Sequence, residues 1–588
     1  MQLARRLAST TVLVLLASCT GPGVSRRDGA STQIATHDAA DLLFRGGTIY
    51  TADPARPRAE AVAVLGGRIV FVGDNGEARR WIGPSTRVVS LAGRMLLPGF
   101  HDAHVHPVEA GVQLSWCDLA QCATPEAAFE TLRRCAHDHP IPAGADPKKN
   151  WFRGRGWQLP VFPEGPRRQD LDAIVGDRPA LIASSDGHSA WVNTAALAIA
   201  GVTRDTPDPQ DGRIERDPKT GEPTGTLRES AAGLVEEHLP PTPLAEVAEG
   251  FRRALHEMAS HGITSFTEAD ASEGILGIYQ KLSDAGELTA KVSVALETDP
   301  EAGPGQVAKL EALRARTRGP RLTASSAKIF ADGVIESRTA ALLEPYLGDP
   351  TGARGLPRYT PDALNDLVEA LDRAHFQVHV HAIGDRAVRM TLDAFERAQA
   401  KNGVRDARHQ IAHLELIDPA DIPRFAKLGV VANFQALWAF ADPYITNLTL
   451  PILGPERSRW IYPIGSVTRS GAAVVFGSDW AVTTVDPLPA IQVGVTRSDP
   501  DAATVSSFIP EERVSLESML EGYTRRGAWI DFREKETGTI EAGKAADLVV
   551  LEHDLFAIPP NEIGRTRVLL TLLDGQEIYR APELAPGS

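Results

Sequence analysis

The sequence contains little cysteine. Only four of its 588 residues are cysteine, and three of them, Cys117, Cys122 and Cys135, lie in one short stretch. These three thiols allow one disulfide at most, and either Cys117–Cys135 or Cys122–Cys135 could form in an oxidising compartment. No second cysteine pair and no neighbouring histidine stands at zinc-finger spacing, which argues against a structural zinc site built from them.

Positive charge is scarce relative to negative charge. Lysine and arginine together number 61, against 76 aspartate and glutamate residues, so the formal net charge is −15. This balance argues against nucleic acid as a partner. The sequence also has no convincing nucleotide-binding glycine motif and no serine nucleophile elbow, which argues against two further classes of chemistry.

The N-terminus lacks an apolar run long enough to cross a bilayer as a helix. Its apolar stretch covers only residues 11–17 and follows two arginines, which is typical of a targeting segment. The stretch ends in Leu-Ala-Ser-Cys at residues 16–19, which resembles a bacterial lipobox. That resemblance implies lipidation of Cys19 and a lipid anchor on the extracytoplasmic side of a bacterial membrane. The alternative is an ordinary signal peptide in which the cysteine is incidental. Residues 20–40, which follow, are predicted to be a tether.

Strand signals occur at both ends of the chain, and alternating strand and helix signals fill the middle. Residues 41–94 and 535–588 contain short apolar runs broken by glycine, which predict a composite β-sandwich made from the two termini. Residues 95–534 are typical of a (β/α)8 TIM-like barrel. Within them, residues 107–241 are too many for a plain loop, so we expect an inserted subdomain that roofs the active site.

The predicted barrel strands are short apolar runs, most of them separated by helical patterns such as residues 244–260, 361–375 and 386–401. They cover residues 95–97, 263–267, 291–296, 327–331, 377–381, 410–413, 430–434 and 473–477.

Two histidines spaced i, i+2 follow the first of these strands. On an extended segment this spacing points His104 and His106 to one face, and imidazole is a common metal ligand. Barrel enzymes place their chemistry at the C-terminal ends of the strands. Further residues with suitable side chains occupy that position on later strands, namely Lys328, His381, His413 and Asp479. Such a set at one end of a barrel predicts a metal centre.

Short motifs occur in order along nearly the whole mature chain. They are Pro-Gly-Phe-x-Asp-Ala-His-Val-His at 98–106, Asp-Gly-His-Ser-Ala-Trp-Val-Asn at 186–193, Lys-Ile-Phe-Ala-Asp-Gly at 328–333, His-Ala-Ile-Gly-Asp at 381–385, Gly-Ser-Asp-Trp at 477–480 and Gly-x-Ile-x-x-Gly-Lys-x-Ala-Asp-Leu at 538–548. With them the chain resembles the amidohydrolase superfamily, and most closely its amidohydrolase-3 (YtcJ-like) branch. It departs from that pattern at Ala412, where the motif usually has Glu before the histidine, and at His101, where an apolar residue is common.

This resemblance implies a metal-dependent hydrolase and assigns the ligands. His104, His106 and Asp479 would hold one divalent ion. The side chains of His381 and His413 would hold a second, and Lys328 would bridge the two after carboxylation by CO2, because an ammonium group has no lone pair to donate. A site with two ions is preferred. If Lys328 is unmodified, the fallback is one ion held by His104, His106 and Asp479 together with either His381 or His413. Zinc is the default, with manganese, iron or cobalt as alternatives.

The expected reaction is hydrolysis of a non-peptide carbon–nitrogen bond in a small molecule, such as an amide or an N-substituted formamide. Metal activation of water would be combined with general base and acid catalysis by Asp479. Residues expected on the substrate side are Trp157, His188, Trp191, Arg338 and His379. The alternatives are a deaminase of a cyclic amidine or nucleobase, and a non-catalytic metal-binding lipoprotein.

Overall fold

The computed structural model describes residues 39–142, 144, 146–210 and 212–584. The predicted leader with Cys19 lies outside the described residues, as does the predicted tether up to residue 38. Within the described part of the chain, no helix combines the length and apolar character needed to cross a membrane.

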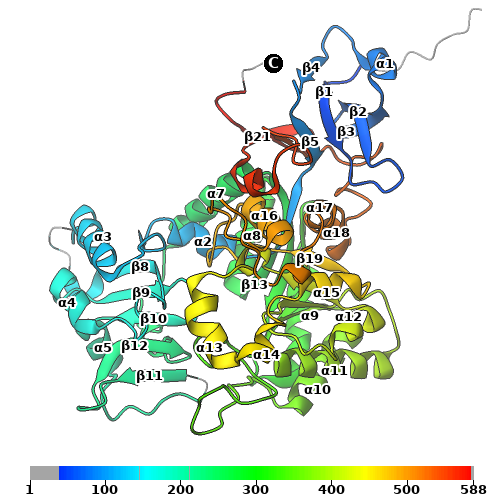
Figure 1. Cartoon of the computed structure of the whole chain (residues 1–588). Coiled ribbons are helices and arrows are strands. Elements are labelled where there is room, and N and C mark those ends of the chain that lie inside the picture. Colours follow the sequence, from blue (N-terminus) through cyan, green and yellow to red (C-terminus); the bar gives the residue numbers. More distant parts are fainter. Residues whose placement is uncertain (1–38, 143, 145, 211, 585–588) are drawn as a thin grey trace, which may run out of the picture. The chain divides into compact units, whose positions relative to one another are not determined.

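Eight parallel strands form the central sheet, and their spatial order follows their order along the chain. The Asp479 backbone N–H donates to the His104 carbonyl at 2.8 Å, and the Asn433 amide donates to the Ala103 carbonyl at 2.9 Å, which ties the first strand to the last two. The chain therefore forms the predicted TIM-like barrel. Its strands are β6 (Phe100–Val105), β13 (Ile263–Ala271), β14 (Lys291–Glu297), β15 (Leu322–Phe330), β16 (Gln377–Ala382), β17 (Gln410–His413), β18 (Val431–Phe434) and β19 (Val474–Phe476) (Figure 1).

Amphipathic helices pack on the barrel, and α10 (Pro361–Arg373) shows why they form. The Thr360 side chain accepts the Ala363 backbone N–H, and a proline occupies the first turn, where its missing N–H costs nothing. Its buried leucines and valine recur at i, i+3, i+4 and i+7, at positions 364, 367, 368 and 371. The other main helices here are α7 (Leu244–Ser260), α8 (Glu273–Asp284), α9 (Val307–Arg316), α11 (Asp385–Asn402), α12 (Ile422–Leu428), α15 (Ile464–Arg469), α16 (Pro487–Thr496), α17 (Leu516–Gly522) and α18 (Arg525–Ile530).

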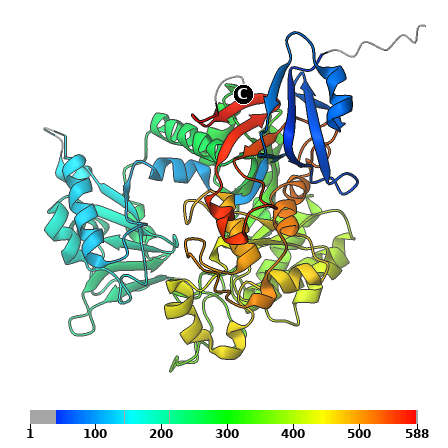
Figure 2. The same ribbon diagram turned by 45° about the horizontal axis from the view of Figure 1, so that its top comes forward.

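Both chain ends contribute to a second sheet of eight strands. Strand β5 joins the two contributions, because it pairs in parallel with β1 and antiparallel with β20. In Figure 2 the blue and red ribbons of this sheet lie beside each other. Its strands are β1 (Leu42–Tyr50), β2 (Arg58–Leu65), β3 (Arg68–Gly73), β4 (Arg87–Ser90), β5 (Met95–Pro98), β20 (Leu548–Leu551), β21 (Val568–Leu573) and β22 (Gln576–Arg580).

The predicted first barrel strand, residues 95–97, is corrected by this sheet. Those residues form β5 of the terminal sheet, and the first barrel strand is the following β6. The chain passes from one sheet to the other at Gly99, whose N–H donates to the Asp547 carbonyl and whose missing side chain leaves room for Thr264. The sequence pattern placed the strand in the apolar run before the glycine because β6 itself contains three polar residues, His101, Asp102 and His104.

A buried lysine links the barrel to the terminal sheet. Lys291 Nζ lies 2.5 Å from Asp547 Oδ2 and 2.9 Å from Asp574 Oδ1, and its side chain is 5% exposed. Replacing it with methionine leaves the buried Asp547 carboxylate without its cation, so we expect Lys291→Met to lower the free energy of unfolding by about 3–5 kcal/mol in urea titrations. The matched substitution Arg567→Met, in an exposed pair with Glu552, is expected to cost less than about 1 kcal/mol, and equal losses would refute the prediction.

The segment between β6 and β13 forms a third sheet, drawn in cyan in Figure 1. Before it, α2 (Pro107–Gln113) packs on α7, where Gly111 and Gly250 allow the two backbones to approach. A disulfide joins Cys117 to Cys135, which is one of the two expected pairings, and Cys122 is free. The elements of this segment are β7 (Cys117–Asp118), α3 (Pro125–Asp138), β8 (Phe152–Trp157), α4 (Arg168–Val175), β9 (Ala180–Ser184), β10 (Ser189–Val192), α5 (Thr194–Ala200), β11 (Gly212–Arg216), β12 (Pro223–Glu229) and α6 (Gly233–Glu236).

Candidate active site

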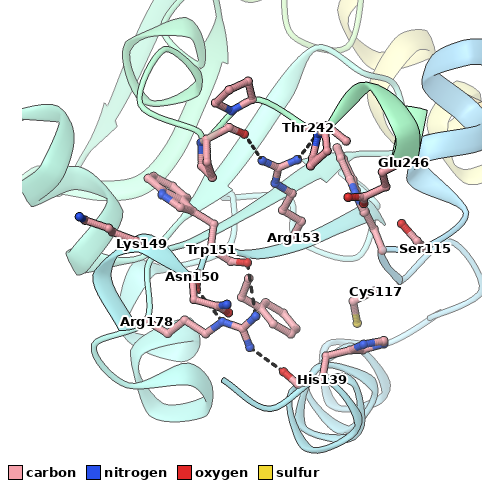
Figure 3. A pocket seen from close by; sticks show the side chains of 15 residues that line it. Ser115, Cys117, His139, Lys149, Asn150, Trp151, Arg153, Arg178, Thr242 and Glu246 are labelled. Carbon is pink, nitrogen blue, oxygen red and sulfur yellow. Dashed lines mark hydrogen bonds between the residues drawn. The ribbon is translucent and has the colours of Figure 1, made fainter. Parts of the chain in front are cut away.

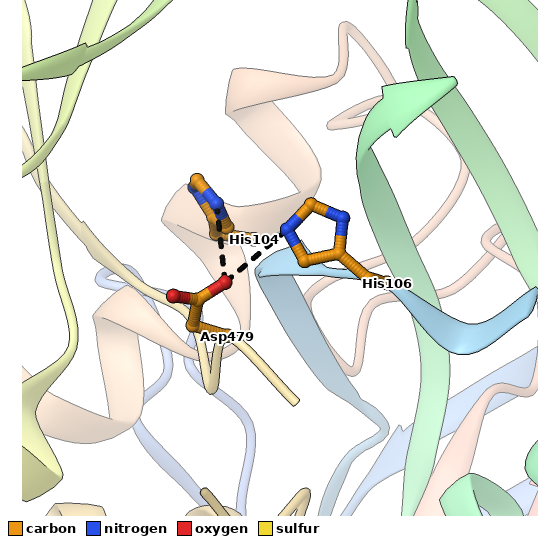
Figure 4. A group of neighbouring side chains, drawn as sticks. All are labelled: His104, His106 and Asp479. Atoms are coloured by element: carbon orange, nitrogen blue, oxygen red, sulfur yellow. Dashed lines mark ion pairs between the residues drawn. The ribbon is translucent and has the colours of Figure 1, made fainter. Parts of the chain in front are cut away.

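Two histidines and one carboxylate converge where β6 and β19 end. Asp479 Oδ1 lies 3.2 Å from His106 Nε2 and 3.5 Å from His104 Nε2 (Figure 4). One potential ligand atom from each of the three residues lies within 4.8 Å of the others. The approach is possible because Gly477 lies against the His104 backbone, where any side chain would collide. This geometry allows all three side chains to bind one ion.

Lys328 lies beside this group. Its side chain, from strand β15, is buried, and its Nζ atom lies 3.3 Å from His104 Nε2. Burial lowers the pKa of its ammonium group to about 8, although the carboxylates of Asp270 and Asp479 oppose the shift. A lowered pKa increases the neutral amine fraction at pH 7, and only the neutral amine can react with CO2. The environment of Lys328 is therefore compatible with carboxylation.

Two further histidines complete the cluster. The His413 ring lies 4.4 Å from that of His381 and 4.7 Å from that of His104, measured between centroids. Its Nδ1 atom is buried, has no hydrogen-bond partner among the described residues and lies 3.9 Å from Asp479 Oδ2. Trp438 stacks parallel to the His413 ring, with 5.7 Å between the ring centroids. The predicted ligands, His104, His106, Lys328, His381, His413 and Asp479, line one pocket of about 740 Å³.

The protonation states of His104, His413 and Asp479 suit the binding of a divalent cation. Burial first, and then the charge of Lys328, holds the pKa of His104 and of His413 well below the usual value, so both rings offer lone pairs. Despite burial, interaction with His106 lowers the pKa of Asp479, which therefore stays anionic. The buried, unpartnered Nδ1 of His413 adds a free donor atom to the same set. Neutral imidazoles with a carboxylate are a typical ligand set for zinc.

His106 differs from its neighbours in charge. Burial favours its neutral form, but hydrogen bonds and charges from Asp479 and Glu268 outweigh burial and raise its pKa to about 10. At pH 7 the ring is thus an imidazolium, which must lose its proton before it can bind a metal. We expect Zn²⁺ binding at pH 7 to release about one proton from this ring, and affinity to increase as pH rises towards 10. Calorimetry in buffers with different ionisation enthalpies measures this release.

The control for that measurement is His375→Gln, because His375 is an exposed histidine outside the pocket. Its proton release should equal that of the unchanged protein. Zinc binding without proton uptake by the buffer would contradict the assignment of His106 as a ligand.

Sequence reasoning missed the residues that hold the histidines in place. Glu268 Oε1 lies 3.2 Å from His106 Nδ1, and the Tyr279 hydroxyl donates to Glu268 Oε2 at 2.7 Å. A signal was present, since Glu268 directly follows the predicted strand at 263–267. Partners of this kind fix the orientation of a ligand and raise its basicity.

Of the expected substrate-side residues, His188 lines the pocket. It lies before β10, and its Nδ1 atom is 2.9 Å from Glu229 Oε2, while the Thr339 hydroxyl donates to Glu229 Oε1 at 2.6 Å. Although burial opposes it, Glu229 raises the pKa of His188 to about 9. An imidazolium from the inserted segment therefore faces the pocket.

The other four residues do not line this pocket. His379 lies behind His104, with its Nε2 atom 2.9 Å from His104 Nδ1, and is fully buried. Trp157 and Trp191 are buried in the inserted segment, where their indole N–H groups donate to backbone carbonyls at 3.1 Å and 2.9 Å. Arg338 is 40% exposed and pairs with Asp349. Spacing alone did not reveal which way these side chains point.

A second pocket, of about 480 Å³, lies between the inserted segment and the start of α7 (Figure 3). Its arginines are engaged by the protein itself. Arg153 donates to the Pro240 carbonyl at 2.7 Å and to Thr242 at 3.0 Å, and Arg178 donates to the carbonyls of Asn150 and His139, both at 2.8 Å. Because the guanidinium groups hold loops together, we assign no chemistry to this pocket.

Comparison with known proteins identifies relatives along nearly the whole chain. The sequence profile described as "Amidohydrolase family" matches residues 87–579. The "Putative amidohydrolase YtcJ" of Bacillus subtilis (strain 168) is 30% identical over 91% of this chain and 99% of its own. An "N-substituted formamide deformylase" of Arthrobacter pascens is 26% identical over 91% of this chain and 97% of its own.

A solved structure has the same architecture. An uncharacterized metal-dependent hydrolase from Pyrococcus furiosus superimposes with a TM-score of 0.66 at 26% identity, covering 87% of this chain and 99% of its own.

Proposed function

Since this chain belongs to the amidohydrolase family and is thus a hydrolase of carbon–nitrogen bonds, we propose that it hydrolyses an amide or an N-substituted formamide in a metal-dependent reaction. The observation that carries this proposal is the convergence of His104, His106 and Asp479 in one pocket at the C-terminal ends of the strands. The relative described as an N-substituted formamide deformylase supports the choice of substrate class.

The pocket residues suit two divalent ions, with zinc as the expected metal. His104, His106 and Asp479 would hold the first, His381 and His413 the second, and carboxylated Lys328 would bridge them. The bound metal would polarise the scissile group and lower the pKa of water towards neutrality. An unmodified Lys328 would leave one ion, held by the first three residues with one further histidine.

Asp479 is the proposed general base and acid. Its carboxylate is anionic and lines the pocket. One oxygen lies 3.2 Å from His106 Nε2, and the other lies 3.9 Å from His413 Nδ1. It can accept a proton from the attacking water and transfer it to the leaving nitrogen. His188, whose ring lies 5.8 Å from that of His381 and which Glu229 holds cationic, can donate a hydrogen bond to the oxygen that gains negative charge.

The proposed reaction is tested with zinc-loaded protein and simple N-alkyl formamides. We expect formate and the free amine to appear in equal amounts. The alternative, deamination of a cyclic amidine or nucleobase, would instead release ammonia and leave the ring intact. A protein that binds zinc but hydrolyses nothing in a broad screen of amides, formamides and amidines would contradict both reactions.

We also propose that the mature protein is anchored to a bacterial membrane on the extracytoplasmic side through lipidated Cys19. The support is the lipobox-like sequence at residues 16–19. Labelling cells with a radioactive fatty acid tests it, because the unchanged protein should take up label and Cys19→Ser should not. Equal labelling of both would contradict the anchor.

A further inference from the structure

One wall of the active-site pocket collects carboxyl groups that form no ion pair with a cation in the described part of the chain. Within the described residues, the carboxylates of Asp186, Glu336, Glu415 and Asp442 line the pocket and form no ion pair. Two other acidic groups of the same pocket face cationic rings of the protein. Asp479 pairs with His106, and Glu229 pairs with His188. Burial raises the pKa of Glu336 to about 7 and, together with the nearby Glu336, raises the pKa of Glu415 well above its usual value. Without a cation these groups are therefore partly protonated, and a cation from outside the chain would supply the counter-charge that lets them ionise.

Three of these carboxylates come from separate loops that meet beyond the barrel strands. Glu336 follows β15, Glu415 follows β17, and Asp442 precedes the π-helical turn Ile445–Thr449. The Thr449 hydroxyl lies 2.8 Å from Glu336 Oε1 and 3.4 Å from Glu415 Oε1. A hydroxyl has one proton to donate, so it cannot satisfy both carboxylates at once. The second donor is either a proton held between the two carboxyl groups or an N–H group of a ligand.

A tyrosine hydroxyl beside these four carboxyl groups has no hydrogen-bond partner among the described residues. Tyr462 is 3% exposed and lines the same pocket, and its backbone N–H donates to the Glu415 carbonyl at 2.8 Å. Its own hydroxyl makes no hydrogen bond within the described part of the chain. Since Tyr462 lines the pocket, its hydroxyl oxygen is free to accept an N–H from a ligand there.

Asp186 shows the same deficiency from the side of the inserted segment. Its Oδ1 atom accepts the His188 N–H at 3.0 Å, whereas its Oδ2 atom is buried without a hydrogen-bond partner in the described residues. Aromatic rings of Trp438 and Tyr444 line the pocket near these groups. Aromatic rings beside carboxylates are a typical environment for an organic cation.

We propose that this wall, made of Asp186, Glu336, Glu415, Asp442 and Tyr462, binds a protonated amine or guanidinium group on the substrate, away from the bond that is cleaved. N–H donors suit it better than a quaternary ammonium, because the unsatisfied atoms are hydrogen-bond acceptors. The inference rests on the proposed function, since it assigns the substrate class of the same pocket: amides or formamides that carry a cationic side chain.

The experiment compares two formamides of the same length, N-formyl-1,5-diaminopentane and N-formylhexylamine, which differ by an ammonium in place of a methyl group. We expect kcat/KM to favour the cationic substrate at least about 30-fold, the lower end of what a desolvated charge pair contributes. Glu336→Gln and, on a separate element, Asp442→Asn should each reduce this preference at least about tenfold. Glu456→Gln, the same substitution at an exposed glutamate outside the pocket, should leave the preference unchanged.

Calorimetric binding of 1,5-diaminopentane to the metal-free protein provides a measurement without turnover. We expect Glu336→Gln to weaken it at least about tenfold and Glu456→Gln to leave it unchanged. If neither formamide is hydrolysed but diamine binding depends on Glu336, the proposed reaction fails and the cation site stands. Equal hydrolysis of both formamides, with diamine binding indifferent to Glu336, would overturn the cation site and leave the reaction standing. Loss of one metal equivalent per chain in Glu336→Gln would also overturn it, because the wall would then be a metal site.

Discussion

Substituting Asp479 with asparagine is expected to lower kcat at least about 10²-fold, the smaller end of the contribution of general acid–base catalysis. The amide has the size of the carboxylate but cannot accept a proton from water or pass one to the leaving nitrogen. The carboxylate also lies 3.2 Å from His106 Nε2, so metal content must be measured on the same sample. The decisive quantity is kcat per metal-loaded site.

The matched control is Asp501→Asn, an exposed aspartate outside the pocket, for which kcat should not change. Near-normal turnover of Asp479→Asn with full metal content would refute the role of this residue in proton transfer. A parallel pH profile adds a second check. Because the pKa of Asp479 is lowered, kcat of the unchanged protein should be constant around neutral pH and should fall only in acid, where Asp479 becomes protonated.

Removing the metal is the second prediction with a large expected effect. Treatment with a chelator should lower turnover at least about 10³-fold. This is a small part of the effect available, because lowering the pKa of water from about 15.7 to about 7 increases the hydroxide present at pH 7 roughly 10⁸-fold. Adding Zn²⁺ should restore activity. Full turnover in protein shown by elemental analysis to be metal-free would contradict the metal-dependent reaction.

Lys328 decides how many ions the pocket holds. We expect two per chain in protein prepared with bicarbonate, and one in Lys328→Met, since methionine cannot be carboxylated. Lys401→Met, an exposed lysine at the end of α11, should leave the count at two. Mass spectrometry under conditions that preserve carbamates should detect the carboxylated lysine. One ion per chain with an unmodified Lys328 would refute the two-ion site.

Much of the barrel and its ligand positions follows from local patterns. Apolar runs separated by amphipathic helices specify parallel strands, and parallel strands place their C-terminal ends at one edge. For this reason His104, Lys328, His381 and Asp479, which are far apart in the sequence, could be predicted to meet. The strand boundary at Gly99 could not, because the polar residues of β6 give no apolar strand signal and only its neighbours in the barrel sheet identify it as a strand.

The barrel, the family and the candidate metal ligands could be predicted from sequence, because strand periodicity and motif spacing are visible over a few residues and repeat along the chain. Only the tertiary structure decided which side chains face the pocket. It placed His379 behind His104, buried Trp157 and Trp191 in the inserted segment, and joined Cys117 to Cys135. It also brought Glu336, Glu415 and Asp442 to one wall. These outcomes depend on how loops from distant strands pack against one another, and no local pattern encodes that packing.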